Sequence, residues 1–152
     1  MKRALLIVLL LFACHIQAQV GIGTTTPLST LDINGNLSVK VVTLNGGAPF
    51  NATQIDDGVY INLIPSSGAQ EFILPDPRTY PGRVYILRNI ENTQQADIYT
   101  QGAAQGVLMF AGDSSTGVGV VNMTTAVGPG NPTKTLIFVS DGANWTYGHL
   151  GF

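Results

Sequence analysis

Residues 135–147 read Thr-Leu-Ile-Phe-Val-Ser-Asp-Gly-Ala-Asn-Trp-Thr-Tyr. β-Branched and aromatic residues dominate both ends of this stretch, as is typical of β-strands. The Asp-Gly pair between them tolerates the backbone angles of a tight hairpin turn. The stretch therefore predicts a β-hairpin with one strand at Thr135–Ser140 and the other at Trp145–Tyr147. In this hairpin we expect Val139 and Trp145 to face each other.

The alternation of short strands and turns extends through most of the chain. Further strand-like runs, each bounded by Gly, Pro, Asn or Asp, lie at Val59–Ile64, Glu71–Leu74, Arg83–Ile90, Ala96–Thr100, Val107–Phe110 and Val118–Met123. Such spacing is typical of antiparallel sandwiches, rolls and barrels, and not of a parallel α/β sheet. We therefore expect an all-β fold, an antiparallel β-sandwich or roll, over residues 55–152.

The composition favours β-structure and argues against a nucleic-acid partner. The chain of 152 residues contains 18 Gly and 8 Pro, and charged residues make up 11% of it, against about 25% in typical globular proteins. Past residue 19 the apolar residues hold no helical period, so almost no helix is expected there. Nucleic-acid binding draws on clustered Lys and Arg, whereas this chain has a net charge of −2. The spaced Arg78, Arg83 and Arg88 are interpreted as solvated or loop-pairing side chains.

The N-terminus has the pattern of a secretory signal peptide. The first three residues, Met-Lys-Arg, are positively charged, and Ala4–Phe12 is a continuous apolar run. This run is shorter than the roughly 20 apolar residues that span a bilayer, so no integral membrane span is expected. We expect a helical signal peptide at residues 1–18, cleavage after Ala18, and a secreted or cell-surface chain that begins at Gln19.

Cys14 leaves a second interpretation of the same segment open. This single cysteine follows Leu-Phe-Ala, which puts a small residue directly before it, as in a lipoprotein signal. Lipid on Cys14 would then anchor the protein to a membrane. Ordinary cleavage is favoured because Phe12 fits the lipoprotein pattern poorly. Neither alternative allows an intrachain disulfide, since one cysteine has no partner.

Residues 19–45 form a distinct lead-in to the β-domain. Leu28–Ile33 is followed by an Asn-Gly pair, a strong hairpin signal, and then by the strand-like Leu37–Leu44. A stretch rich in Gly and Asn then interrupts the strand pattern. We therefore place the boundary with the main domain within residues 45–54.

The lead-in carries apolar residues that it cannot bury by itself. They are Val20, Ile22, Leu28, Leu31, Ile33 and Leu37. A segment of this length builds no core of its own, so these side chains pack either on the domain of the same chain or against other chains along a symmetry axis. The second arrangement is favoured, and it makes these residues the expected interface between copies of the chain.

Two parts of the chain resemble known surface proteins. Val-Gly-Ile-Gly-Thr-Thr-Thr-Pro at 20–27, followed by Leu-Asp-Ile-Asn-Gly at 31–35, resembles the VGIGT-x-x-P … LDVNG motif of tail-fibre-like and adhesin-like secreted proteins of Bacteroidota and their phages. Residues 74–90 and 138–145 resemble a β domain often found in the same proteins. The resemblance implies a secreted, homotrimeric β module with a structural or adhesive role and no catalytic residues. A single copy of the lead-in motif implies a short tip, cap or stand-alone unit.

Few residues of the expected mature chain can do chemistry. His149 is its only histidine and lies close to the end of the sequence, and no cysteine would remain after cleavage. Neither a Ser-His-Asp triad nor a zinc site is therefore expected. Asp56 and Asp57 lack the alternating spacing of a calcium loop. We expect a non-enzymatic protein without cofactors.

Two alternative functions stay open beside the structural or adhesive module. The first is a monomeric secreted carbohydrate-binding β-sandwich, in which Trp145 and Tyr147 share one face of the last strand and form a platform for sugar rings. The second is a small polysaccharide-cleaving, tail-spike-like protein, whose paired carboxylates no local motif would mark. The favoured hypothesis expects the chain itself as partner, with a surface glycan or a fibre protein as a further partner.

Overall fold

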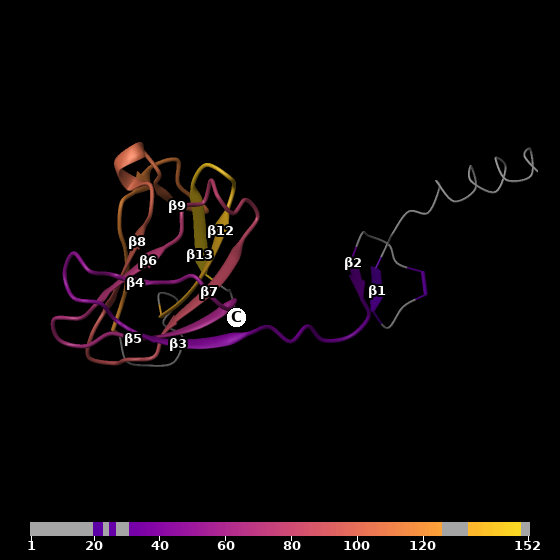
Figure 1. The fold of residues 1–152 in the computed structure, drawn as a ribbon, viewed down its shortest axis with the longest axis horizontal. Helices are drawn as coiled ribbons and strands as arrows, with labels where there is room; N and C mark the ends of the chain where they lie inside the picture. The colour runs from indigo at the N-terminus through magenta and orange to yellow at the C-terminus, as the bar shows by residue number, and fades with distance from the viewer. Residues whose placement is uncertain (1–19, 23–24, 27–30, 126–133, 150–152) are drawn as a thin grey trace, which may run out of the picture. The chain divides into compact units, whose positions relative to one another are not determined.

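The computed structural model describes residues 20–22, 25–26, 31–125 and 134–149 (Figure 1). The expected signal peptide, with its helix and Cys14, lies outside these residues, and so does Leu28 of the expected interface. Cleavage and lipid attachment therefore stay predictions.

The described residues are almost entirely β-structure, so the all-β prediction is confirmed. They contain a short 3-10 turn at Ala103–Gln105 and no α-helix. None of them belongs to a helix that is long and apolar enough to cross a membrane. The chain divides into two units, the first ending at Ser38 and the second beginning at Val39.

The first unit contains two short parallel strands. β1 (Val20–Ile22) pairs in parallel with β2 (Leu31–Ile33), and the amide of Asn34 donates to the carbonyl of Ile22 at 2.9 Å. The Asn-Gly pair after β2 forms a bend, and residues 36–40 have no regular structure. The predicted hairpin at this pair is therefore wrong, because β2 pairs with the strand that precedes it.

The first six strands of the second unit alternate between two facing sheets (Figure 1). They are β3 (Val41–Asn45), β4 (Thr53–Gln54), β5 (Tyr60–Ile64), β6 (Glu71–Leu74), β7 (Val84–Asn89) and β8 (Ala96–Thr100). β3, β5 and β7 are parallel neighbours in one sheet, and β4, β6 and β8 are parallel neighbours in the other. The chain therefore winds through three coils with one strand per sheet, as in a parallel β-solenoid.

This winding corrects the prediction of an antiparallel sandwich, because the sheets have mixed orientation. Two parallel neighbours need a crossover between them, which is usually a helix. Here each crossover contains a strand of the opposite sheet: β4 lies between β3 and β5 in the chain, and β6 between β5 and β7. Strand-and-turn spacing is the same for this arrangement as for a series of hairpins, so the spacing predicted strands correctly and their partners wrongly.

The remaining strands complete the two sheets. They are β9 (Met109–Ala111), β10 (Gly117–Val118), β11 (Val121–Met123), β12 (Thr135–Ser140) and β13 (Trp145–His149). β12 runs antiparallel to β7, and β11 runs antiparallel to β8. The result is a seven-stranded sheet, β10-β9-β13-β12-β7-β5-β3, and a four-stranded sheet, β11-β8-β6-β4.

The hairpin predicted from residues 135–147 is confirmed as β12–β13, with a register that differs by one residue. Ser140 pairs with Trp145, and Val139 pairs with Thr146, so Val139 and Trp145 lie on opposite faces of the sheet. The loop sets this register, because the carboxylate of Asp141 accepts hydrogen bonds from two loop amides at 2.6 and 2.7 Å.

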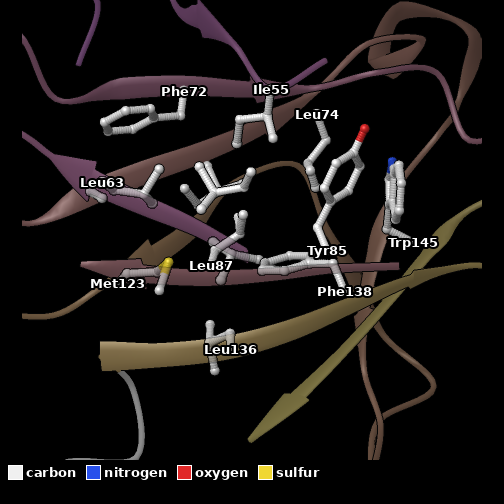
Figure 2. Packing of buried hydrophobic residues seen from close by; sticks show 14 of the residues in the cluster. Ile55, Leu63, Phe72, Leu74, Tyr85, Leu87, Met123, Leu136, Phe138 and Trp145 are labelled. Carbon is white, nitrogen blue, oxygen red and sulfur yellow. The ribbon is translucent and has the colours of Figure 1, made fainter. Parts of the chain in front are cut away.

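The core lies between the two sheets of the second unit (Figure 2). Its largest fully buried side chains come from both sheets and include Ile55, Ile61, Leu63, Phe72, Leu74, Tyr85, Leu87, Phe138 and Trp145. β3 adds Val42 and Leu44 to this core. The unit therefore begins before β3, at Val39, earlier than the boundary expected within residues 45–54, since Val42 and Leu44 pack against the core of the second unit.

Candidate functional site

A groove runs along the side of the second unit where the coils turn from the four-stranded sheet to the seven-stranded sheet. Its first part has a volume of about 240 Å³ and receives side chains from the end of β4, from the loop between β6 and β7, and from the residue after β8. Its second part, of about 350 Å³, shares Asp56 and Arg83 with the first. We call this hollow the Arg83 groove and define it by Gln54, Asp56, Asp57, Tyr80, Arg83 and Gln101.

The loop between β6 and β7 is fixed by the β12–β13 hairpin. The indole N–H of Trp145 donates to the carbonyl of Pro75 at 3.2 Å, and the hydroxyl of Ser140 donates to the carbonyl of Pro77 at 2.9 Å. The amide of Gly82 in turn donates to the carbonyl of Ser140 at 3.0 Å. The β12–β13 hairpin therefore supports, from outside the groove, the loop that contributes Pro75 and Tyr80 to its lining.

Arg83 is held by two tyrosines, Tyr80 and Tyr85. Its guanidinium carbon lies 4.0 Å from the centre of the Tyr80 ring, within the range of a cation–π contact. Its Nη1 donates to the hydroxyl of Tyr85 at 3.3 Å, and the ring of Tyr85 lies 5.8 Å from that of Trp145, centre to centre (Figure 2). Within the described part of the chain no carboxylate lies within ion-pair distance of Arg83. Its other N–H groups are therefore available to a ligand.

Several charged side chains on the loops that border the groove are already paired. Asp57 forms an ion pair with Lys40, and the hydrogen bond from Lys40 is the main cause that lowers the pKa of Asp57. Arg78 donates to Asp76 through Nε (2.9 Å) and Nη2 (2.5 Å), and these bonds lower the pKa of Asp76. The side chain of Asp56 makes no hydrogen bond to the described residues. Among the described residues, the carboxylate of Asp56 and the guanidinium of Arg83 therefore border the same groove and neither forms an ion pair.

The predicted sugar platform at Trp145 and Tyr147 is wrong. Trp145 is 0% exposed, so no sugar ring can stack on it. Tyr147 is half-buried, and its ring stacks on Phe138 with 5.5 Å between ring centres. The two side chains do share one face of β13, but this is the face that packs on the core.

Two carboxylates lie side by side on the outer face of the four-stranded sheet. Glu71 on β6 is aligned with Asp97 on β8. Burial raises the pKa of Asp97, a hydrogen bond from Gln95 opposes this rise, and the charge of Glu71 adds to it. Neither acid borders the Arg83 groove. The described residues contain no group of three or more His, Cys, Asp and Glu that could hold a metal ion, and polysaccharide cleavage by paired carboxylates stays a hypothesis.

A second candidate surface is an apolar patch on the seven-stranded sheet. We call it the outer apolar face and define it by Val41, Tyr60, Val84, Ile86, Ile137 and Val139. The strand register aligns Val41, Tyr60, Ile86 and Ile137 in one row and places Val84 beside Val139. Val41 is 59% exposed, and Val84 and Val139 are 37% and 38% exposed. An exposed sheet face usually carries polar side chains, so this face has the composition of a buried one.

The apolar residues of the lead-in are exposed as well. Val20, Ile22, Leu31 and Leu37 have exposed fractions of 53%, 54%, 56% and 64%. Ile33 is half-buried. The parallel pairing of β1 and β2 brings Val20 beside Leu31 and Ile22 beside Ile33. Four of the five described residues of the expected interface therefore lie on one small sheet, Leu37 follows it in the chain, and all but Ile33 are exposed.

Comparisons with protein-family models, with characterised proteins and with solved structures find no match to this chain. Its function is therefore inferred from its own residues.

Arg83 was interpreted from the sequence as a solvated or loop-pairing side chain, and the groove around it was missed. The alternation of side chains along a strand could have indicated this groove, since residues two apart point to the same face. Arg83 therefore shares its face with Tyr85, which is buried. An arginine on the core side at the start of a strand lies at the rim of the sandwich, where a groove can form.

Proposed function

We propose that this chain is a secreted structural or adhesive module that assembles with copies of itself, as a homotrimer, at a cell surface or in a fibre. The observation that carries the proposal is the outer apolar face, and the exposed apolar residues of the lead-in add a second surface of the same kind. The sequence motifs of the lead-in support the cell-surface or fibre setting. We propose no catalytic role.

The outer apolar face would stabilise an assembly by being buried. Burying apolar surface contributes about 25 cal/mol per Å², and stable interfaces bury about 800 Å² on each partner. The six side chains of this face stand on four adjacent strands, β12, β7, β5 and β3, and so form a continuous centre for an interface. Contiguous exposed apolar patches of this kind mark interaction sites in soluble proteins.

A second copy of the chain is the partner that the charges of this face favour. The neighbouring aligned row is Thr43, Asn62, Arg88 and Thr135, in which Arg88 is the one charged side chain. Two such faces can therefore meet without bringing many like charges together. The lead-in also calls for a partner, because two strands of three residues do not form a stable sheet alone.

The proposal is tested by placing a charge on the outer apolar face. Val41→Lys introduces an ammonium group where an assembled partner would lie, and Val41 is exposed enough for the single chain to fold around it. Asn122→Lys is the matched control, because Asn122 is exposed on a strand of the other sheet. Light scattering after size exclusion should show a lower mass for Val41→Lys and an unchanged mass for the control. Equal masses for both variants would contradict the role of this face.

Carbohydrate binding is the second candidate function, and the Arg83 groove is the observation that favours it. The groove presents an arginine, a carboxylate and two amide side chains beside a tyrosine. This composition differs from that of the outer apolar face and suits a polar ligand. The two candidates are compatible, because an adhesive module needs both an assembly surface and a ligand site.

A further inference from the structure

We infer that the Arg83 groove binds a short segment of neutral glycan, with one sugar ring in each of its two parts. A glycan ligand would specify the proposed adhesive role. Its biological relevance rests on that proposed role. The site itself is built from residues of one chain, so binding and assembly can be measured separately.

The size of the groove fits a disaccharide. Its two parts have volumes of about 240 and 350 Å³, whereas pockets for drug-sized ligands start at about 300 Å³. Asp56 and Arg83 border both parts, so they lie where the linkage between two rings would pass. An elongated ligand can therefore use both residues at once.

The side chains of the groove match the hydroxyl groups of a sugar, each of which donates and accepts hydrogen bonds. Arg83 donates, Asp56 accepts, and the amides of Gln54 and Gln101 do both. The side chains of Gln54, Asp56 and Gln101 make no hydrogen bonds to other described residues. Tyr80 is 41% exposed and adds an aromatic surface for the C–H groups of a ring.

The groove is also organised before any ligand arrives. Tyr80 and Tyr85 hold the guanidinium of Arg83, and the bonds from Trp145 and Ser140 fix the loop that bears Tyr80. Binding therefore costs little ordering of Arg83 and of the loop that bears Tyr80, which favours affinity.

The charges of the groove distinguish a neutral glycan from other ligands. Asp56 lines both parts, whereas Asp57, which lines one, is paired with Lys40, so a phosphate or an acidic sugar would meet the charge of Asp56 beside Arg83. An apolar ligand would displace water from Arg83, Asp56 and Gln101 without offering them hydrogen bonds, which disfavours its binding. A polyol gives every charged and amide group a hydrogen-bonding partner.

The test uses the chain from Gln19 and five disaccharide probes. Maltose, cellobiose, lactose and diacetylchitobiose are neutral, and digalacturonic acid is the acidic comparison. Saturation-transfer NMR identifies binders, and calorimetry gives the affinity. The variants are Arg83→Ala and Gln101→Ala, with Arg88→Ala as the matched control, because Arg88 is an exposed arginine on the outer side of β7.

At least one neutral probe should bind. Arg83→Ala should weaken it about tenfold or more, since hydrogen bonds to charged groups contribute about 1.5–3 kcal/mol, and Gln101→Ala about two- to tenfold. Arg88→Ala should bind as the parent does. Three results would each overturn the inference. They are the absence of saturation transfer to every neutral probe, tighter binding of digalacturonic acid than of the neutral probes, and equal losses of affinity in Arg83→Ala and Arg88→Ala. Glycan binding by a monomer would contradict the assembly proposal alone, and a trimer without binding would contradict the glycan site alone.

Discussion

At the scale of single residues, Trp145 links the core to the groove. Its ring is fully buried, and its N–H reaches the carbonyl of Pro75 on the loop that leads to Tyr80 and Arg83. The same residue was the main candidate for a sugar platform, on the sound expectation that it shares a face with Tyr147. Sequence alternation gives the shared face but does not say whether that face meets the opposite sheet or the solvent.

Replacing this indole tests its role. Trp145→Phe removes the N–H donor, leaves the carbonyl of Pro75 without its partner, and opens a gap in the core. We expect a loss of about 2–4 kcal/mol in the free energy of unfolding, measured by urea denaturation. Tyr147→Phe is the control, because the hydroxyl of Tyr147 makes no hydrogen bond to the described residues, and it should change stability little. A Trp145→Phe variant as stable as the control would show that the bond to Pro75 contributes nothing.

Asp97 gives the fold a pH dependence of known sign. Its pKa is raised in the folded chain, mainly by burial, so the folded state binds this proton more tightly than the unfolded state does. Stability from this group is therefore full below the unfolded value of 3.8 and is lost as pH rises through the raised value. Asp97→Asn should be more stable than the parent at pH 7, and the difference should shrink as pH falls toward 4. Urea denaturation at both pH values checks this.

Asp57 is the matched opposite case. Its pKa is lowered by Lys40, so its contribution is present above 3.8 and is lost as pH falls through the lowered value. Asp57→Asn should therefore be no more stable than the parent at pH 7. If both asparagine variants shifted stability in the same direction, the assignment of opposite pKa shifts would be wrong.

At the scale of elements, the sequence predicted strands better than it predicted their neighbours. The β12–β13 hairpin could be found because Asp-Gly is a local signal that ties two adjacent strands together. The parallel pairs β3–β5 and β5–β7 could not be found from the sequence, because a strand of the other sheet lies between the two members of each pair in the chain. One sign of parallel pairing was present, since β7 carries apolar Ile86 on its outer face as well as buried side chains on its inner face.

The turn after β8 offers a test of the third coil. Gly102 and Gly106 both have positive φ, +81° and +87°, but a Cβ on Gly102 would meet Val107 Cγ2 at 2.7 Å and Arg78 Nη2 at 2.9 Å, whereas one on Gly106 meets nothing within 4 Å. Gly106→Ala should therefore lose about 1 kcal/mol of stability from backbone strain alone. Gly102→Ala should lose more, about 2–3 kcal/mol. Equal losses in thermal or urea denaturation would show that Gly102 is needed only for its backbone angle.

At the scale of the whole molecule, the central question is what covers the exposed apolar surface. The sequence correctly marked the lead-in as a segment without a core, and Val20, Ile22, Leu31 and Leu37 are exposed. It did not predict the outer apolar face, because that face exists only once β12, β7, β5 and β3 are placed side by side. Periodicity identifies the two sides of each strand, whereas a patch depends on which strands are neighbours.

The most direct test of self-assembly is the solution mass of the chain that begins at Gln19, measured by light scattering after size exclusion over a range of concentrations. We expect a mass three times that of the single chain, because the outer apolar face and the lead-in would be buried between copies. A monomer that keeps the mass of one chain at every concentration would contradict it.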